Sequence, residues 1–130
     1  MRKVKEEVQI FDFHRKKWLV LTPEEWVRQH VMNYLVNVKG YPASRIGVEK
    51  DIELNDTKKR FDIVVYGETK EPFILIECKA PYVELTGKVL EQALRYNLTL
   101  KAHFVMISNG VSDFILYGME RPAELPPFIK

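Results

Sequence analysis

The stretch from residue 60 to residue 79 constrains the fold of this chain more than any other. It reads RFDIVVY, then GETKEP, then FILIECK. Two apolar, β-branched runs around a segment rich in Gly, Pro and charge predict a β-hairpin. Because side chains alternate between the two faces of a strand, Glu77 and Lys79 point the same way, roughly 7 Å apart. In the natural register Asp62 faces the same side as Glu77, so two carboxylates and an ammonium meet at one end of an apolar sheet.

Composition predicts a single soluble domain of ordinary globular type. The 130 residues are 46% hydrophobic and 29% charged, which is enough for a core of its own. The net charge of +2 argues against a general polyanion binder. The single cysteine, with no Cys/His cluster at zinc spacing, excludes a structural zinc site. No apolar run is long enough to span a membrane and no leader opens the chain, so we expect a cytoplasmic protein.

A helix is predicted from residue 23 to residue 39. Thr22 is suited to the N-cap, Pro23 to the first helical position, and Glu25 completes a capping box. Gly40 ends the apolar period. Acids in a first turn favour the helix dipole, so Glu24 and Glu25 have a complete structural explanation without any catalytic role.

The remaining patterns predict an α/β fold with a central mixed β-sheet flanked by helices and an N-terminal β-hairpin. A helix over 84–101 separates the strand that ends near residue 79 from the strand over 104–107, which implies a parallel pair there. We expect the polar tip of the N-terminal hairpin, residues 14–16, to be a solvated turn. The other expected elements are a hairpin over 8–21 and strands over 46–54 and 114–117. One domain over 1–130 is expected, with an arm over 1–21, a core over 22–118 and an irregular tail over 119–130.

The carboxylates at the end of the hairpin form a hard-oxygen site of the kind that Mg²⁺ prefers. The backbone carbonyl of Cys78 could add another oxygen, and Lys79 could position a water and offset charge on a phosphate. These parts fit phosphodiester hydrolysis. Arg60, the last of three cations before Asp62, stands beside the same site. The alternative is a plain Asp–Lys or Glu–Lys ion pair at a sheet end.

The order of elements around this site resembles the PD-(D/E)xK nucleases, which have the restriction endonuclease-like fold. More narrowly, the chain resembles the N-terminal nuclease domain of type I restriction enzyme R subunits. The blocks that carry the resemblance run in order from Thr22 to Tyr117. They are TPEEWVRQ, KRFDIVVY, LIECKAP, LEQALRYN and ISNG.

This resemblance implies roles for individual residues. Asp62 and Glu77 would be metal ligands, Lys79 the catalytic lysine, and an acid on the first helix would complete the site. The resemblance favours Glu25 for that acid, with Glu24 as the alternative. Phe61 stands where the superfamily name has proline, a position that does no chemistry.

The second helix carries the residues expected to meet nucleic acid. Gln92 and Tyr96 match a Gln-x-x-x-Tyr element that lies beside the site in some of these nucleases, and packing beside the sheet is the alternative. Lys88 is on the same stripe. Together with Arg60 it is a candidate phosphate contact, with a solvated lysine as its alternative. Trp18 and Trp26 are expected to be packing residues.

The function expected from these features is a Mg²⁺-dependent nuclease that hydrolyses phosphodiester bonds of DNA, with Mn²⁺ as a substitute ion. The chain has no Walker motif, so a partner would supply any motor or sequence specificity. A homodimer is compatible with the sequence. The alternative is a nucleic-acid-binding or assembly module on the same fold with weak or absent cleavage. A further variant keeps the chemistry and changes the substrate to branched, single-stranded or RNA forms.

Overall fold

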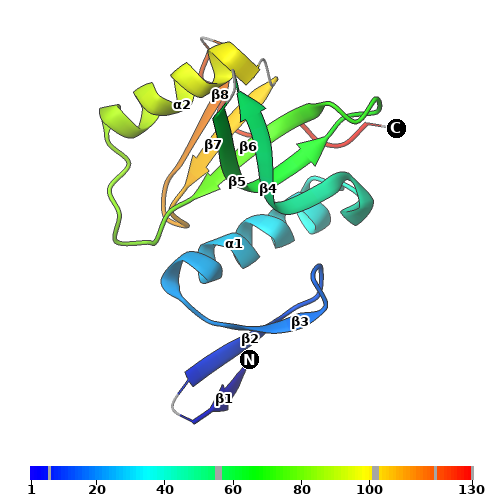
Figure 1. Ribbon diagram of the computed structural model, residues 1–130, viewed down its shortest axis with the longest axis vertical. Coiled ribbons are helices and arrows are strands. Elements are labelled where there is room, and N and C mark those ends of the chain that lie inside the picture. Colours follow the sequence, from blue (N-terminus) through cyan, green and yellow to red (C-terminus); the bar gives the residue numbers. More distant parts are fainter. Residues whose placement is uncertain (6, 55–56, 101–102, 119, 130) are drawn as a thin grey trace.

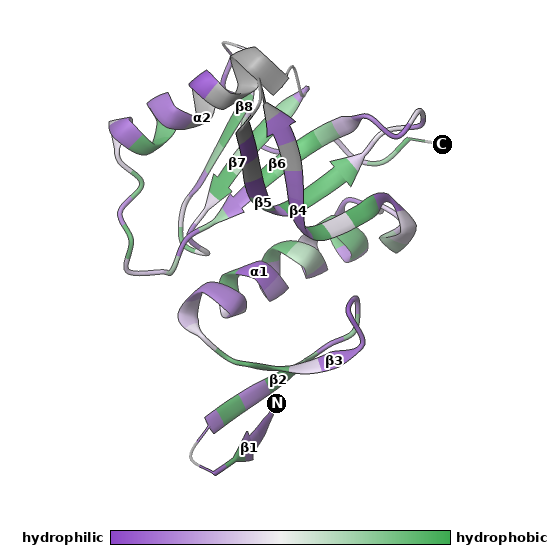
Figure 2. Ribbon diagram, viewed as in Figure 1, coloured by the Kyte–Doolittle hydropathy of each residue, from purple (hydrophilic) through white to green (hydrophobic). Residues whose placement is uncertain are grey.

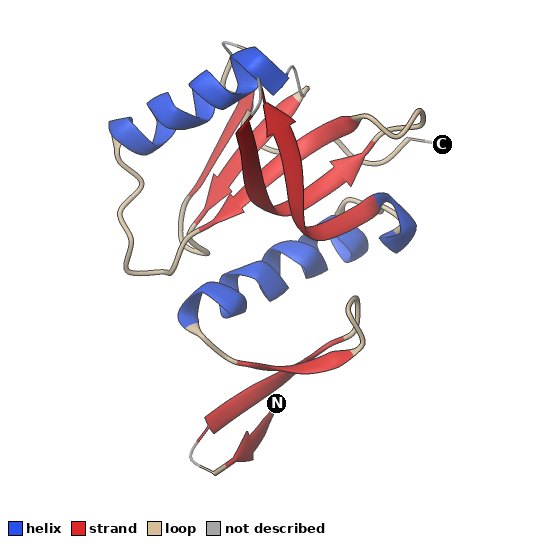
Figure 3. Cartoon of the chain, in the orientation of Figure 1, coloured by secondary structure: helices blue, strands red, loops and turns tan. Residues whose placement is uncertain are grey.

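A five-stranded sheet forms the centre of the protein (Figure 1; Figure 3). The computed structural model describes residues 1–5, 7–54, 57–100, 103–118 and 120–129. All neighbouring strands are antiparallel except β6 and β7, which run parallel with helix α2 crossing between them, so the predicted mixed sheet is confirmed. The strands in spatial order are β4 (Ile46–Leu54), β5 (Thr57–Tyr66), β6 (Pro72–Cys78), β7 (Phe104–Ser108) and β8 (Asp113–Tyr117).

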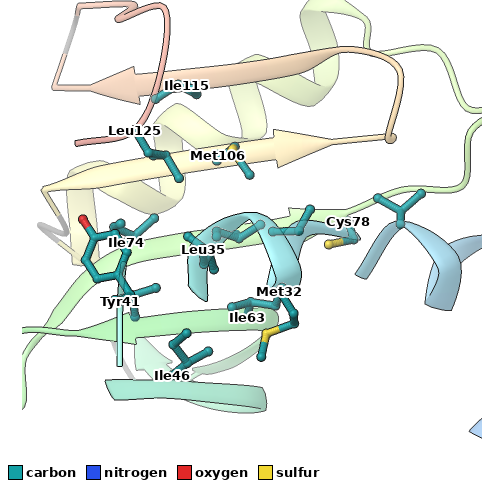
Figure 4. Packing of buried hydrophobic residues seen from close by; sticks show 14 residues of the cluster. Met32, Leu35, Tyr41, Ile46, Ile63, Ile74, Cys78, Met106, Ile115 and Leu125 are labelled. Atoms are coloured by element: carbon teal, nitrogen blue, oxygen red, sulfur yellow. The ribbon is translucent and has the colours of Figure 1, made fainter. Parts of the chain in front are cut away.

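Both faces of this sheet are covered, which explains the nearly continuous apolar runs in β5 and β6. On one face, Ile63, Ile74 and Cys78 pack against the first helix and the C-terminal tail (Figure 4). On the other face, Val64 and Leu75 pack beneath α2 (Gly87–Leu100). The apolar colouring of the central strands follows this burial (Figure 2). Each fully buried aliphatic side chain contributes about 1.5–3 kcal/mol to folding.

The first helix begins where the sequence predicts. Helix α1 (Pro23–Asn33) has Thr22 as its N-cap, whose Oγ1 accepts the Glu25 N–H at 3.0 Å. The last turns differ from the expected α-helix, because residues Tyr34–Val38 form a π-helical segment. Its closing bond runs from the Lys39 N–H to the Tyr34 carbonyl at 3.0 Å. The helical region therefore ends close to residue 39 as predicted, with a wider final turn.

Helix α2 is shorter at its start than the predicted 84–101. It begins at Gly87 because the Thr86 carbonyl accepts the N–H groups of Val89 and Leu90 at 3.1 and 3.2 Å. Thr86 thus stands at the N-terminal boundary, a position that threonine favours.

The N-terminal segment forms a separate three-stranded antiparallel sheet, on the other side of α1 from the central sheet (Figure 1). Its strands are β1 (Arg2–Val4), β2 (Glu7–Asp12) and β3 (Lys17–Val20). The hairpin of β2 and β3 is the predicted one. Strand β1 was not predicted, because its three residues are too few to show an alternating pattern.

The described part of the tail, residues 120–129, has no helix or strand and packs against the end of the first helix. Leu125 is fully buried in the core. The Tyr41 hydroxyl donates to the Pro126 carbonyl at 2.7 Å, and the Phe128 N–H donates to the Lys39 carbonyl at 2.8 Å. This tail closes the apolar face that α1 leaves uncovered.

Candidate active site

Asp62 lies where β5 and β6 separate. The last pair of this ladder joins Ile63 to Ile76, and the same register continued by one residue sets Asp62 opposite Glu77. The Cys78 N–H donates to Asp62 Oδ2 at 2.7 Å. This bond holds the Asp62 carboxylate against the backbone at the end of β6.

Glu77 and Lys79 are close to each other, as the two-residue spacing predicts. Lys79 Nζ lies 3.8 Å from Glu77 Oε2, and both side chains are partly exposed. The Lys79 N–H donates to the Ser108 carbonyl at 2.8 Å, which ties this end of β6 to β7. The pair therefore stands on a fixed backbone with its charged ends accessible to solvent.

Arg28 joins the first helix to Asp62. Its Nη1 donates to Glu25 Oε1 at 2.8 Å and its Nη2 donates to Asp62 Oδ1 at 2.9 Å. Burial opposes the charge on Arg28, but the hydrogen bond to Asp62 and the charge of Glu25 outweigh it and raise the guanidinium pKa. Arg28 Nε is buried and has no acceptor among the described residues. One guanidinium thus brings the helix acid and the strand acid together.

Glu25, and not Glu24, belongs to the charged cluster around Arg28 and Asp62. The Glu25 carboxylate does not close the capping box, since the Thr22 N–H donates to the Val20 carbonyl at 3.0 Å. It accepts instead from Arg28 and from Gln29 Nε2, the latter at 3.2 Å. Glu24 is exposed. Glu25 therefore contributes its backbone N–H to the helix cap and its carboxylate to the bond with Arg28. A catalytic role for Glu25 stays a prediction.

The tip of the N-terminal hairpin docks on the same cluster, so the expectation of a solvated turn is wrong. Arg15 Nη2 donates to Glu25 Oε1 at 2.8 Å, and Arg15 Nε pairs with Asp12 Oδ2. His14 Nε2 lies 2.9 Å from the Ile46 carbonyl. Asp12 Oδ1 accepts the N–H groups of His14 and Arg15 at 2.8 and 3.1 Å. An aspartate just before a four-residue turn is the signal that could have predicted this ordered tip.

Burial and hydrogen bonding have opposite effects on the pKa of Asp12. Burial acts to raise the pKa of this carboxyl, but hydrogen bonds from Arg15 and from the His14 amide outweigh burial and lower the pKa below its ordinary value. Arg15 responds in the complementary way: burial opposes its charge, and Asp12 and Glu25 raise its pKa. The tip is therefore held by fully charged partners.

Glu49 is a site residue that sequence reasoning missed. It lies on β4 opposite Asp62 in the register, and its φ of 53° interrupts the pairing between Val48 and Lys50. Its Oε1 lies 3.5 Å from Arg28 Nη1 and 3.8 Å from Arg15 Nη1. A positive φ at a glutamate is rare and gives no signal in an alternating strand pattern. Four carboxylates and two guanidiniums meet here, which leaves a formal charge of −2.

Within the described part of the structure, the predicted nucleic-acid contacts Arg60 and Lys88 make no hydrogen bond or ion pair with this charged cluster, whereas Gln92 and Tyr96 are not placed relative to it. Arg60 is exposed and pairs with Asp51 at 3.5 Å. Lys88 and Gln92 are exposed on α2. Tyr96 is on the same helix, and its side chain is outside the described part of the structure. The roles of all four stay predictions.

The oxygen donors near Asp62 suit a Mg²⁺ ion, but the described side chains do not form a complete set of ligands. The Cys78 thiol is buried, and burial, with a smaller effect from the Asp62 charge, raises its pKa, so the side chain is a neutral packing group. The carboxylates offer hard oxygens that suit Mg²⁺, which needs only one or two of them and keeps several waters. Among the described residues, no group of three His, Cys, Asp or Glu side chains is arranged to hold an ion. The residues fit Mg²⁺ in donor type and number if the remaining positions are filled by water or phosphate.

The sheet order and the carboxylates beside a lysine define a restriction endonuclease-like domain of the PD-(D/E)xK class. The family model of the type I restriction enzyme R protein N terminus matches residues 23–125, and the chain belongs to this family. A solved structure of a candidate DUF820 nuclease from Anabaena variabilis has the same fold, with a TM-score of 0.51 at 14% identity. The match covers 92% of this chain and 76% of that one. No curated protein matches the chain. None of the described helices is both long and apolar enough to cross a membrane.

Proposed function

We propose that this protein is a metal-dependent nuclease that hydrolyses phosphodiester bonds of DNA. The observation that carries the proposal is the bridge by Arg28, which binds Glu25 and Asp62 at 2.8 and 2.9 Å. Two acids of the family pattern thereby meet at one end of the sheet, and we propose that Glu77, one residue past the last β5–β6 pair, joins them there. Membership of the R-subunit family supports the same reaction class.

Each residue has a definite part in this reaction. Asp62 and Glu77, with the Cys78 carbonyl, would hold Mg²⁺ or Mn²⁺, and the ion when bound would stabilise negative charge on the phosphate. Lys79 Nζ, 3.8 Å from Glu77, would orient the attacking water and offset charge that develops on the phosphate. Glu25 would complete the acid set from the helix side. Arg28 keeps Glu25 and Asp62 oriented through its two hydrogen bonds.

The family supports a proposal for the substrate and partners. DNA is the proposed substrate, and Arg60, Lys88, Gln92 and Tyr96 are proposed to contact it. A partner would supply a motor or sequence specificity, as the family context suggests. A cytoplasmic location and a homodimer remain part of the proposal.

The test is a cleavage assay on supercoiled, linear and single-stranded DNA with Mg²⁺ or Mn²⁺. We expect Asp62→Asn and Lys79→Ala to reduce cleavage by about a hundredfold or more, because the first weakens metal binding and the second removes a positive charge beside the reacting phosphate. Asp113→Asn and Lys50→Ala, which change exposed residues of β8 and β4, are the matched controls. Titration calorimetry with Mn²⁺ should show weaker binding for Asp62→Asn. Cleavage that survives both site substitutions would rule out the assigned residues.

A second candidate function is a nucleic-acid-binding or assembly module with little or no cleavage. It is favoured by the engagement of both Asp62 oxygens, one by Arg28 and the other by the Cys78 N–H. A metal ligand must give up or share these bonds. Absence of cleavage on every substrate with either ion, together with DNA binding that persists, would select this function over the nuclease.

A further inference from the structure

One face of the N-terminal sheet carries a continuous row of aromatic rings. Residues paired across antiparallel strands share a face, so the pairs Arg2–Gln9, Gln9–Val20 and Phe11–Trp18 lie together. The Arg2 guanidinium stacks 4.0 Å from the Trp18 ring centroid, and Arg2 Nε donates to Gln9 Oε1 at 2.7 Å. We call Arg2, Phe11, Phe13, Trp18 and Val20 the aromatic face.

The rings of this face contact one another and remain accessible to solvent. Phe11 meets Trp18 at 5.4 Å and Phe13 at 4.9 Å between ring centroids. Phe13 is 83% exposed and Trp18 is 39% exposed, so Trp18 packs against its neighbours as predicted and keeps part of its ring accessible. The contact with Arg2 orients the indole while leaving it accessible.

The opposite face of the same sheet makes the attachment to the rest of the protein. Asp12 follows Phe11 on β2 and therefore points the other way. It is buried and pairs with Arg15, which reaches Glu25 on α1. The sheet is thus anchored through one face, which leaves the aromatic face unused by the fold.

The charge of the arm selects a polyanion as its partner. Residues 1–20 contain six Lys or Arg and three Asp or Glu, a net +3, whereas the other 110 residues contain 14 and 15, a net −1. Five of the six cations are exposed. They are Arg2, Lys3, Lys5, Lys16 and Lys17. The positive charge of the whole chain therefore resides on this small sheet.

A cleft with a mostly apolar lining adjoins the aromatic face at the hairpin tip. Phe13 forms one wall of this cleft of about 270 Å³, and amide side chains of α1 and its π-helical extension, including Gln29, Asn33 and Asn37, line it. Asn37 Nδ2 donates to Asn33 Oδ1 at 2.6 Å. Amide groups beside an exposed ring match the edges and the face of an unpaired base.

We propose that the aromatic face and the adjoining cleft bind single-stranded nucleic acid. Bases would stack on Trp18 and Phe13, and the exposed turn residues Lys5 and Lys16 would neutralise phosphates. Unpaired bases are favoured over duplex because bases within a duplex are already stacked on one another. The choice of DNA as the first ligand rests on the proposed nuclease function, whereas binding to this face needs neither metal nor cleavage.

The first test is fluorescence anisotropy of the full chain with labelled dT and rU 20-mers and a 20-bp duplex, in the presence of a chelator. Trp18→Leu and Phe13→Ala are each expected to raise the Kd for single strands about tenfold, with a smaller change for duplex. Trp26→Leu, at the same 39% exposure on α1, and Ile129→Ala, at 80% exposure, are the matched controls. The controls should bind within twofold of the unchanged chain. The two oligonucleotides separate DNA from RNA as the source of the strand.

A second variant tests the phosphate contacts without altering any ring. Lys5→Gln combined with Lys16→Gln, at the two exposed turns of this sheet, should reduce the slope of log K against log salt for single strands by about 1.4. Circular dichroism checks the fold of each variant, and Phe13→Ala keeps the test valid should Trp18→Leu unfold.

Three outcomes would overturn the proposal: unchanged Kd values in both ring variants, equal losses for duplex and single strands, or a dimer in sedimentation that Trp18→Leu dissociates. The last outcome would assign the face to self-association. Cleavage assays on the same variants separate the two proposals. Intact strand binding without any cleavage contradicts only the nuclease, and intact cleavage with unchanged strand binding contradicts only this surface.

Discussion

The five-stranded sheet and the N-terminal sheet use the same residue types in different surroundings. Val64 and Leu75 in the central sheet are fully buried, between helix α2 and the neighbouring strands. Val8 and Val20 in the N-terminal sheet are more than two-fifths exposed. The central sheet is stabilised by burial on both faces, whereas the N-terminal sheet buries a charged residue, Asp12, at its tip.

The charged cluster both attaches the N-terminal sheet and orients the acids of the candidate active site. Buried charges cost several kcal/mol each in desolvation unless they are paired and hydrogen-bonded. Arg15 and Arg28 supply those pairs to Asp12, Glu25 and Asp62. The same contacts attach the N-terminal sheet to α1 and orient the acids of the candidate active site, so attachment and orientation are expected to fail together.

The largest effect is expected in the central sheet. Leu75→Ala should lower the free energy of unfolding by about 4 kcal/mol, because the side chain is fully buried and leaves a cavity. Urea unfolding followed by circular dichroism measures the change. Leu19→Ala on β3, where the leucine is only partly buried, is the control and should cost about 1 kcal/mol. Equal costs at the two leucines would break the comparison between the sheets.

The second-largest loss of stability is expected for Arg28, which bridges helix α1 and strand β5. Arg28→Met should cost about 3 kcal/mol of stability, since it leaves the Glu25 and Asp62 carboxylates without this partner. Arg95→Met removes an exposed arginine that pairs with Glu91 at 3.3 Å, and should cost less than about 0.5 kcal/mol. Thermal unfolding at two salt concentrations measures both. A similar loss in the two variants would mean that the cluster is no more than a surface network.

Local patterns were sufficient to predict most of the fold. The N-cap at Thr22 and the stop at Gly40 bound the first helix closely, because caps depend on neighbouring residues. The alternation in β4 and the apolar run of β6 predicted strands at nearly their observed bounds, whereas β5 begins at Thr57, three residues before its apolar run and within a segment predicted to be a turn. The parallel pair followed from the helix that crosses between β6 and β7.

The partners within the candidate site could not be predicted in the same way. Arg15, Arg28 and Glu49 come from the hairpin tip, α1 and β4, and no sequence period links such distant positions. The positive φ of Glu49 depends on tertiary contacts and contradicts the preference of the residue type. The Glu-x-Lys spacing predicted that Glu77 and Lys79 lie close together because Lys79 directly follows the last residue of the strand that carries Glu77. Contacts between residues on different helices and strands depend on the tertiary fold, which local sequence patterns do not describe.

A smaller, pH-dependent loss of stability is expected at Asp12 in the tip of the N-terminal hairpin. Asp12→Asn should cost about 2 kcal/mol at pH 7, because it weakens charged hydrogen bonds to Arg15. Hydrogen bonds from Arg15 and the His14 amide overcome burial and lower the pKa of Asp12 in the folded state. The contribution is therefore complete above the unfolded pKa of about 4 and is lost as the pH falls through the lower folded value.

Urea unfolding from pH 7 to pH 3 tests this sign. The difference in stability between the unchanged chain and Asp12→Asn should shrink as the pH falls below about 4. Asp51→Asn, an exposed acid that pairs with Arg60 on the central sheet, should show a small difference at every pH. A gap for Asp12→Asn that widens toward low pH would contradict the charged pairing.

The smallest effect sharpens the comparison between the sheets with one chemical change at two valines. Val20→Thr should alter stability by less than about 0.5 kcal/mol, because the added hydroxyl of this exposed side chain stays in water. Val64→Thr makes the same change in a fully buried position, where a hydroxyl costs about 1–3 kcal/mol when it lacks a partner. Urea unfolding of the two variants side by side measures the difference. A large loss for Val20→Thr would show that the N-terminal sheet is covered in solution, and it would place a partner or a second copy of the chain on the aromatic face.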